Sequence, residues 1–209
     1  MRFFVSVGPN PRVARMAIAE KGIDIATEVV DILRGENMKE PFRTLNPFVQ
    51  TPALQFDDGR VLSESVAIVE YLEELHPKPT LIGATAEERA LTRMWVRRID
   101  FGVVQPMTLG FRGAEGLRMF KERTRCLPEA AEGLKAIARD GLERLEGLIG
   151  EQPYIMGSEV RLPDLLLYCF LDFGAGVGQP LPPGNRRLAA WFERMAARPS
   201  AAATAGVPT

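Results

Sequence analysis

The sequence has few cysteines and histidines and almost no net charge. Two cysteines and one histidine in 209 residues exclude a disulfide framework, a Cys-rich or His-rich metal site and any triad that needs a second histidine. The 26 basic and 27 acidic side chains give a net charge of −1, which argues against nucleic-acid binding by bulk electrostatics. No apolar run approaches the roughly 18 residues of a membrane span, and the N-terminus does not resemble a secretory signal. We therefore expect a cytoplasmic protein with neither nucleic-acid nor membrane partners.

The composition is ordinary for a globular protein, with 46% hydrophobic and 25% charged residues. The length fits one large domain or two small ones. The first 80 residues alternate between strand and helix patterns in the order β-α-β-α-β-β-α. Strands are predicted over 2–7, 25–33, 52–56 and 61–62, with a hairpin turn at Asp57-Asp58-Gly59-Arg60 between the last two. Helices are predicted over 12–21, ended by Gly22, and over 63–75, capped by Ser63, with a short helical stretch inside 34–46. This order predicts an α/β domain over residues 1–79.

Residues 76–85 are rich in proline and glycine and indicate a linker. After it, no strand pattern is convincing, and apolar residues recur at helical spacing. Helices are predicted over 86–111, 128–149, 163–173 and 188–197. The third is almost wholly apolar and is expected to form the buried centre of this half. The sequence therefore predicts an all-helical domain over residues 86–200. The last residues, 201–209, have little to bury and are expected to form a flexible tail.

The segment LNPFVQTPALQFDDGRVLSESVAIVEYL contains two features that suit a peptide-like ligand. A cis bond before Pro52 would turn the backbone groups of Thr51 outward. Glu64 and Ser65 lie where a hairpin strand leads into a helix, so free N–H groups there face a carboxylate while Glu64 meets an ammonium. A structural turn at Thr51 and a helix cap without ligand remain the alternatives.

Taken together, the motifs of this chain resemble those of the glutathione S-transferases over nearly its full length. The matching motifs are NPRVARMAIAEKG, LNPxxxTPAL, DDGxxLSESxAIxxYL, the linker HPKPTLIG, an E-x7-W pattern opening the helical part, and LPD before the apolar helix. The resemblance implies a thioredoxin-like α/β N-terminal domain, an all-α C-terminal helical bundle, a homodimer, and a glutathione site along the domain boundary.

The resemblance also assigns site residues. Glu64 and Ser65 match the pair that holds the γ-glutamyl end of glutathione, and Thr51, before cis Pro52, matches the residue whose backbone bonds the cysteinyl unit. Gln50 matches a contact for the glycyl end. Glutathione is then the co-substrate, and no metal is expected.

The thiol-activating position departs from the family pattern. The usual Tyr, Ser or Cys, which lowers the pKa of the glutathione thiol, falls at Gly8. The turn SVGPNPR resembles that of an atypical microbial subgroup that also lacks this group and relies on other donors. Here Asn10 and Ser6 flank the position and are the candidate catalytic residues, together with N–H groups of the first helix. Capping of that helix is the alternative role for Asn10.

Two further interpretations stay open. Phe48 either inserts into a partner subunit or packs in its own core. Positions on the long helix at three- to four-residue spacing either line an electrophile pocket or serve helix packing: Gln105, Thr108, Phe111 and Arg112. The family histidine that often follows this Phe-Arg pair is replaced by Gly113.

The sequence thus predicts a glutathione transferase, with a detoxifying role, that conjugates the glutathione thiolate to a small apolar electrophile. The alternative is a transferase-fold protein that binds glutathione or a protein partner with little or no catalysis. Isomerase or dehalogenase chemistry on the same fold also stays open, whereas reductive deglutathionylation is disfavoured because no cysteine lies in the turn over 8–12.

Overall fold

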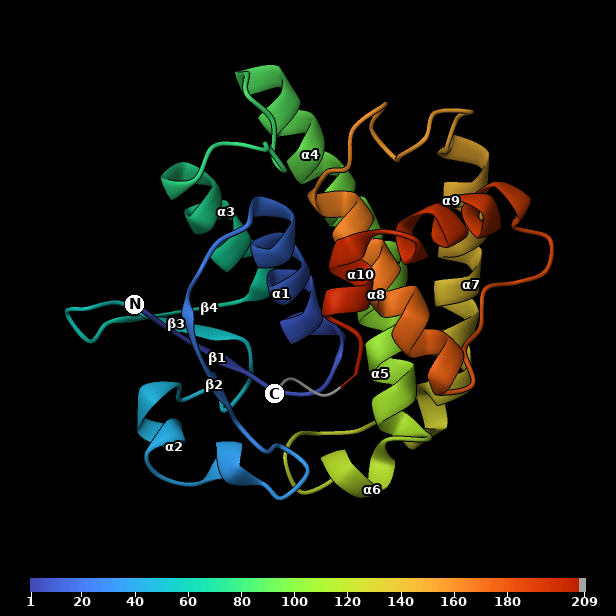
Figure 1. Cartoon of the computed structure of the whole chain (residues 1–209). Coiled ribbons are helices and arrows are strands. Elements are labelled where there is room, and N and C mark those ends of the chain that lie inside the picture. The colour runs from blue at the N-terminus through green and yellow to red at the C-terminus, as the bar shows by residue number, and fades with distance from the viewer. Residues whose placement is uncertain (207–209) are drawn as a thin grey trace. The chain divides into compact units, whose positions relative to one another are not determined.

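The computed structural model describes residues 1–206 (Figure 1). It divides into two compact units, one formed by Met1–Ala84 with the segment from Ala197 onward, the other by Thr85–Ala196. The residues after Ala196 thus group with the N-terminal unit, whereas the sequence placed residues up to 200 in the helical domain. No helix of residues 1–206 is long and apolar enough to cross a membrane.

The first unit is built on a four-stranded mixed sheet in the order β2-β1-β3-β4. β1 runs parallel to β2, while β3 is antiparallel to both β1 and β4. The turn between β3 and β4 contains the predicted Asp-Asp-Gly-Arg hairpin, and Gly59 adopts the left-handed φ of 88° there that favours glycine. The thioredoxin-like prediction is confirmed. The strands are β1 (Arg2–Val5), β2 (Ala26–Val29), β3 (Ala53–Gln55) and β4 (Val61–Ser63).

Helices cover both faces of this sheet (Figure 1). Alternate residues of β1 point to opposite faces: Phe4 packs edge-on against Phe42 of α2, with ring centroids 5.9 Å apart. The other face carries α1 and α3, which pack against each other. Gly22 ends α1 in the left-handed conformation, φ 61°, as the sequence predicts. The helices are α1 (Pro9–Lys21), α2 (Phe42–Leu45), α3 (Ser65–Leu75) and α10 (Pro199–Ala203), with a 3-10 turn over Glu36–Met38.

The C-terminal segment is anchored on α1 by one carboxylate. Glu20 accepts hydrogen bonds from Arg198 at 2.6 and 2.7 Å and from the hydroxyl of Ser200 at 2.5 Å. Ala201 and Thr204 are buried. The predicted flexible tail covers 201–209; its residues 207–209 lie outside the described residues, and the part before them includes the end of a docked helix.

The regular elements named in the second unit are all helices, in agreement with the predicted all-helical domain. The long helix expected over 86–111 is α4, a π-helical turn (Asp100–Val104) and α5 in succession. The π turn lies where α7 crosses closely: a Cβ added at Gly141 would stand 2.0 Å from the carbonyl oxygen of Gly102. The elements are α4 (Ala86–Ile99), α5 (Gln105–Gly113), α6 (Leu117–Phe120), α7 (Ala131–Leu148) after a 3-10 turn (Pro128–Ala130), α8 (Leu162–Gly176) and α9 (Arg186–Ala196).

The apolar helix α8 forms the centre of this unit, as its sequence predicts, and one buried carboxylate fixes its start. Asp164 is fully buried and accepts hydrogen bonds from the backbone N–H of Arg161 and of Ile155, each at 2.9 Å. The indole N–H of Trp191 donates to it at 2.8 Å. Three donors therefore satisfy the carboxylate that burial would otherwise penalise.

Candidate functional site

The turn that leads into α1 is shaped around a glycine. Gly8 is the N-cap residue of α1 with φ 120° and ψ 166°, a region that only glycine adopts without strain. A Cβ built there would meet only Pro11 Cδ, at 4.0 Å, so backbone conformation rather than space excludes a side chain. The backbone conformation therefore favours glycine at position 8, which the sequence resemblance aligns with the thiol activator.

Ser6, one of the two predicted catalytic residues, is buried and hydrogen-bonded. It is 2% exposed, its hydroxyl is hydrogen-bonded to the hydroxyl of Thr51, and it also donates to the carbonyl of Val7 at 3.0 Å. This geometry favours a role in bracing Thr51, and a direct contact of Ser6 with a thiol stays a prediction.

The loop before Pro52 presents the predicted peptide-binding backbone. The bond between Thr51 and Pro52 is cis, as predicted. Thr51 is half-buried, Pro52 is buried, and Gln50 is exposed. Phe48, in the same loop, is 74% exposed, so packing in its own core is excluded.

Two buried amides that sequence reasoning missed support this loop. Asn37 Nδ2 donates to the carbonyl of Val49 at 2.6 Å, and Asn46 Nδ2 donates to the carbonyl of Gln50 at 2.8 Å. Val49 has φ 52°, a conformation that is rare for a β-branched residue. The two amides hold this strained backbone directly before Thr51. Asparagines in a polar stretch give no sequence signal that separates such a role from an ordinary turn.

The N-terminus of α3 carries the second predicted group of ligand contacts. Glu64 is exposed and occupies the N-cap position with φ 70° and ψ 120°, outside the regions that non-glycine residues favour. The described residues supply no side-chain cap for this helix, which leaves its first amides for a ligand anion. Ser63 ends β4 instead, so the prediction that Ser63 caps the helix is wrong.

Asn10 and Ser65 join the first turns of α1 and α3. The Ser65 hydroxyl donates to Asn10 Oδ1 at 3.3 Å, and Ser65 is 5% exposed while Asn10 is exposed. Since Gly8 is the N-cap of α1, the alternative of Asn10 as the cap is wrong. Asn10 Oδ1 takes the serine hydroxyl, so the amide NH₂ of Asn10 is left to donate.

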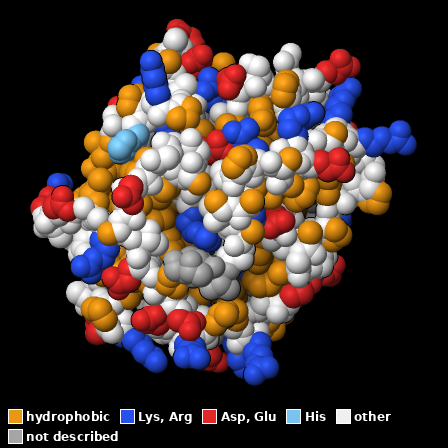
Figure 2. All heavy atoms as spheres, in the orientation of Figure 1, with side chains coloured by type: hydrophobic (Ala, Val, Ile, Leu, Met, Phe, Trp, Pro, Cys, Tyr) orange, Lys and Arg blue, Asp and Glu red, His pale blue; other side chains and the backbone are white. Residues whose placement is uncertain are grey.

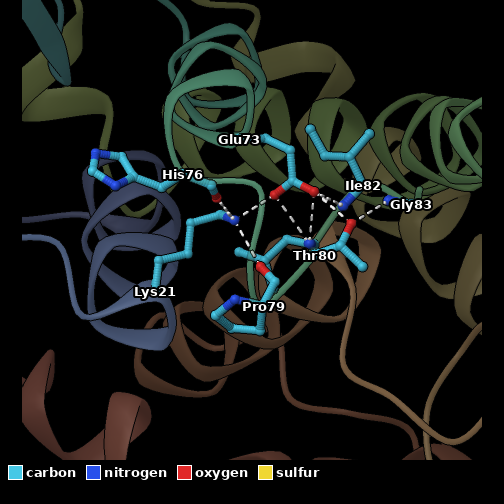
Figure 3. A network of polar contacts seen from close by, with 8 residues as sticks. Lys21, Glu73, His76, Pro79, Thr80, Ile82 and Gly83 are labelled. Atoms are coloured by element: carbon cyan, nitrogen blue, oxygen red, sulfur yellow. Dashed lines mark hydrogen bonds and ion pairs between the residues drawn. The ribbon is translucent and has the colours of Figure 1, made fainter.

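A buried ion pair fixes the opposite ends of the same two helices. Lys21, the last residue of α1, contacts Glu73 in the last turn of α3 at 2.5 Å, and both side chains are almost fully buried. Figure 3 shows Lys21 reaching from α1 towards Glu73 and the linker. Burial alone would raise the pKa of Glu73, but hydrogen bonds from Lys21 and Thr80, with the lysine charge, hold that pKa below its ordinary value.

The same network binds the linker to the N-terminal unit. Lys21 donates to the carbonyls of His76 and Pro79, each at 2.7 Å. Glu73 accepts from the Thr80 hydroxyl at 2.5 Å and from the backbone N–H of Leu81 at 3.1 Å. Sequence reasoning missed this pair, because a lysine and a glutamate on amphipathic helices look like ordinary surface charges.

The candidate pocket residues of α5 have partners within the helical unit. Phe111 packs edge-on against Phe173, with ring centroids 5.0 Å apart, and the guanidinium of Arg112 lies 5.0 Å from the ring centroid of Phe120. Gln105 is exposed and donates to Asp100 at 3.2 Å. These contacts favour helix packing for Phe111 and Arg112, while Thr108 is half-buried.

The surface charges and the possible metal ligands of residues 1–206 bear on the predictions made from composition. Acidic and basic side chains are interspersed over the face drawn in Figure 2, in keeping with the net charge of −1. Within residues 1–206, no three histidine, cysteine or carboxylate side chains gather in a way that would hold a metal ion. The candidate site described above combines hydrogen-bond donors, two helix N-termini and the exposed carboxylate of Glu64.

Comparison with known families decides what these features belong to. Residues 7–75 match the family model of the glutathione S-transferase N-terminal domain, and residues 115–199 match that of the C-terminal domain. The chain belongs to the glutathione S-transferase family. The matches cover both units, so the resemblance seen in the sequence motifs is confirmed along the chain.

Relatives in this family have more than one named activity. The chain is 30% identical over 200 residues to glutathione S-transferase 2 of Saccharomyces cerevisiae, covering 92% of this chain and 84% of that protein. It is 31% identical over 155 residues to a maleylacetoacetate isomerase of Pseudomonas aeruginosa, covering 73% and 71%. A transferase and an isomerase are thus both among its relatives.

Solved structures confirm the glutathione S-transferase fold. The crystal structure of Gtt2 from Saccharomyces cerevisiae matches with a TM-score of 0.89 at 28% identity, over 98% of this chain and all of that one. A glutathione S-transferase domain-containing protein of Marinobacter aquaeolei matches with a TM-score of 0.87 at 30% identity, covering 96% and 100%.

Proposed function

We propose that this protein binds glutathione on its N-terminal unit and transfers the thiolate to a small apolar electrophile. The observation that carries the proposal is the hydrogen bond between Ser65 and Asn10. Ser65 opens α3, whose N-terminus suits the γ-glutamyl group. Asn10 carries the only side-chain amide in the turn over residues 8–12, where we expect the thiol to bind.

The γ-glutamyl end is a zwitterion, and the start of α3 complements both of its charges. The ligand carboxylate binds the backbone N–H groups of the first turn, where the helix dipole is positive. The exposed Glu64 carboxylate pairs with the ligand ammonium. Because the Ser65 hydroxyl already donates to Asn10, Ser65 serves the ligand through its backbone.

The middle and the end of glutathione follow the loop before Pro52. The backbone N–H and C=O of Thr51 pair with the cysteinyl unit as a neighbouring strand would. Gln50 is exposed beside it and reaches the glycyl carboxylate. The hydrogen bonds that the side-chain amides of Asn37 and Asn46 donate keep this backbone in place before the ligand arrives. This lowers the entropy lost on binding.

The thiolate is stabilised without a tyrosine, serine or cysteine at Gly8. The side-chain NH₂ and the backbone N–H of Asn10 supply hydrogen bonds to the sulfur, and the start of α1 supplies its positive helix end. Pro9 and Pro11 have no N–H to add, and the N–H of Arg12 is bonded to the carbonyl of Gly8. Such donors favour the charged form and lower the thiol pKa from a free value of about 8.5. The rate gain then comes from a larger thiolate fraction and from proximity to the electrophile.

A second candidate reaction is glutathione-dependent isomerisation of a small unsaturated acid, favoured by the 31% identity to maleylacetoacetate isomerase. The first steps are shared, because both reactions need a bound thiolate. Binding of glutathione without catalysis is the remaining alternative.

We expect the protein to act in the cytoplasm as a homodimer, with the exposed Phe48 inserted into the partner subunit.

Calorimetric titration with glutathione, followed by assays on the same sample, tests the proposal. Binding together with conjugation of chlorodinitrobenzene supports a transferase. Binding together with isomerisation of maleylacetoacetate, but without conjugation, supports the second reaction. Binding without turnover of either compound supports a ligand-holding protein. The proposal is overturned if no binding is seen at about millimolar glutathione, a concentration that detects binding free energies of about −4 kcal/mol or stronger.

A further inference from the structure

The helical unit contains a cavity that the proposed function does not use. It measures about 240 Å³ and lies between α7 and the segment that joins α8 to α9, with α5 at its base. Figure 1 shows that segment running beside α7. The cavity is lined by Met107 of α5, by Lys135, Ala138, Arg139 and Leu142 of α7, and by residues 178–183.

The wall facing α7 is held in place by backbone geometry. Gly178 has φ 78°, and Gln179 donates from its backbone to the carbonyl of Gly174 at 2.8 Å and from its side chain to the carbonyl of Met107 at 3.2 Å. The three prolines at 180, 182 and 183 restrict the backbone further. The cavity is therefore bounded by a fixed wall, and its volume does not depend on a loose loop.

The two cations of α7 that line the cavity differ in their partners. Lys135 is 7% exposed and donates to Glu115 at 2.6 Å and to Glu132 at 3.0 Å, so two carboxylates neutralise it. Arg139 lies one turn further on, is exposed, and has no ion-pair partner in the described part of the chain. Arg139 is thus the cation available to a ligand.

The geometry points to a binding site for a small aromatic carboxylate, with its ring in the cavity and its carboxylate on Arg139. An apolar cavity of about 150 Å³ is enough for benzene, so 240 Å³ accommodates one substituted ring. Met107, Leu142 and the prolines supply apolar and sulfur contacts to the ring. Glu115 and Glu132 repel an anion from the Lys135 side, and a guanidinium matches a carboxylate with two parallel hydrogen bonds.

Titration with phenylacetate, observed through the methyl NMR signals of labelled methionines, tests this site in the full chain. Replacement of Met107 by leucine assigns its signal, and phenylacetamide serves as the uncharged analogue. We expect phenylacetate to shift the Met107 signal saturably and phenylacetamide to bind at least about tenfold more weakly, since a charged hydrogen-bonded pair contributes more than about 1.4 kcal/mol.

Three variants separate the site from a non-specific effect. Arg139→Gln is expected to weaken phenylacetate binding about tenfold, Ala138→Leu to abolish it by filling the cavity, and Arg144→Gln, an exposed arginine on the same helix, to leave it unchanged. Thermal melting identifies any variant that fails to fold. Equal binding of the amide and the acid, an unchanged affinity in Arg139→Gln, or no saturable shift up to about 10 mM overturns the assignment.

Discussion

The hydroxyl of Ser65 donates a hydrogen bond to Oδ1 of Asn10 at 3.3 Å. Ser65 opens α3 and Asn10 lies in the first turn of α1, so one bond connects the two helix N-termini proposed to meet glutathione. It also fixes the orientation of the Asn10 amide, because the oxygen is occupied and the NH₂ group remains. We therefore propose that binding of the γ-glutamyl group and stabilisation of the thiolate are physically coupled.

This coupling predicts a non-additive pair of substitutions. Ser65→Ala leaves the Asn10 amide free to rotate, so we expect turnover to fall in Ser65→Ala and in Asn10→Ala, with little further loss in the double variant. The coupling energy from kcat/KM in a double-mutant cycle is expected to lie between about 0.5 and 3 kcal/mol. Fully additive losses would show that the two residues act independently.

Glu64 combines a proposed ligand contact with a strained backbone, at φ 70° and ψ 120°. Glu64→Ala is expected to abolish glutathione binding in calorimetry without unfolding the protein, since the side chain is exposed. Glu64→Gly loses the same carboxylate but relieves the strain, so it is expected to be about 1 kcal/mol more stable than Glu64→Ala. Retained glutathione affinity in both variants would contradict the site assignment.

Restoring the usual family residue at Gly8 is expected to fail. Gly8→Ser places a side chain at φ 120° and ψ 166°, which costs about 1–3 kcal/mol and displaces the start of α1. We therefore expect a lower melting temperature and no gain in conjugation rate. A Gly8→Ser variant with unchanged stability and faster turnover would mean that the turn tolerates an activating hydroxyl.

The ion pair between Lys21 and Glu73 predicts a pH-dependent stability. The pKa of Glu73 is lowered in the folded protein, so its contribution is fully present above the unfolded value of about 4.3. It is lost as the pH falls through the lower folded pKa. Removing one partner of a buried pair costs about 3–5 kcal/mol, so Glu73→Gln is expected to be that much less stable near neutral pH.

Thermal or urea unfolding at several pH values measures this difference. The gap between wild type and Glu73→Gln is expected to narrow as the pH falls below about 4. Glu74→Gln, at an exposed neighbour in the same helix, is the matched control and is expected to change stability by less than about 1 kcal/mol. A gap that stays constant down to low pH would contradict the assignment to the Glu73 carboxylate.

Much of the fold follows from local sequence patterns. Alternating apolar residues and the Asp-Asp-Gly-Arg turn predict the strands on either side of residues 57–60, and Gly22 predicts the end of α1. Helical periodicity likewise predicts α7 and α8. These features were predictable because residues close in sequence determine them. Ser63 was misassigned as a cap because a serine before a helical pattern fits a cap and a strand end equally well.

The contacts between distant segments were not predictable in the same way. The pairs Lys21–Glu73 and Glu20–Arg198 join residues that are far apart in sequence, and each partner alone looks like a solvated charge. The second pair anchors α10 on α1. The sequence predicts a tail over residues 201–209 because that segment has little to bury, and an ion pair to a distant residue does not appear in such a pattern. The support from Asn37 and Asn46 likewise appears only when the loop before Thr51 is seen in three dimensions.

The most direct test of the central claim is the ultraviolet absorbance of bound glutathione thiolate against pH, in wild type and in Asn10→Ala. The account predicts a thiol pKa in the wild-type complex clearly below the free value of about 8.5. In Asn10→Ala, the pKa returns part of the way towards that value while glutathione affinity changes little. An unshifted thiol pKa in wild type, or the same lowered pKa in both proteins, would contradict the proposed role of Asn10.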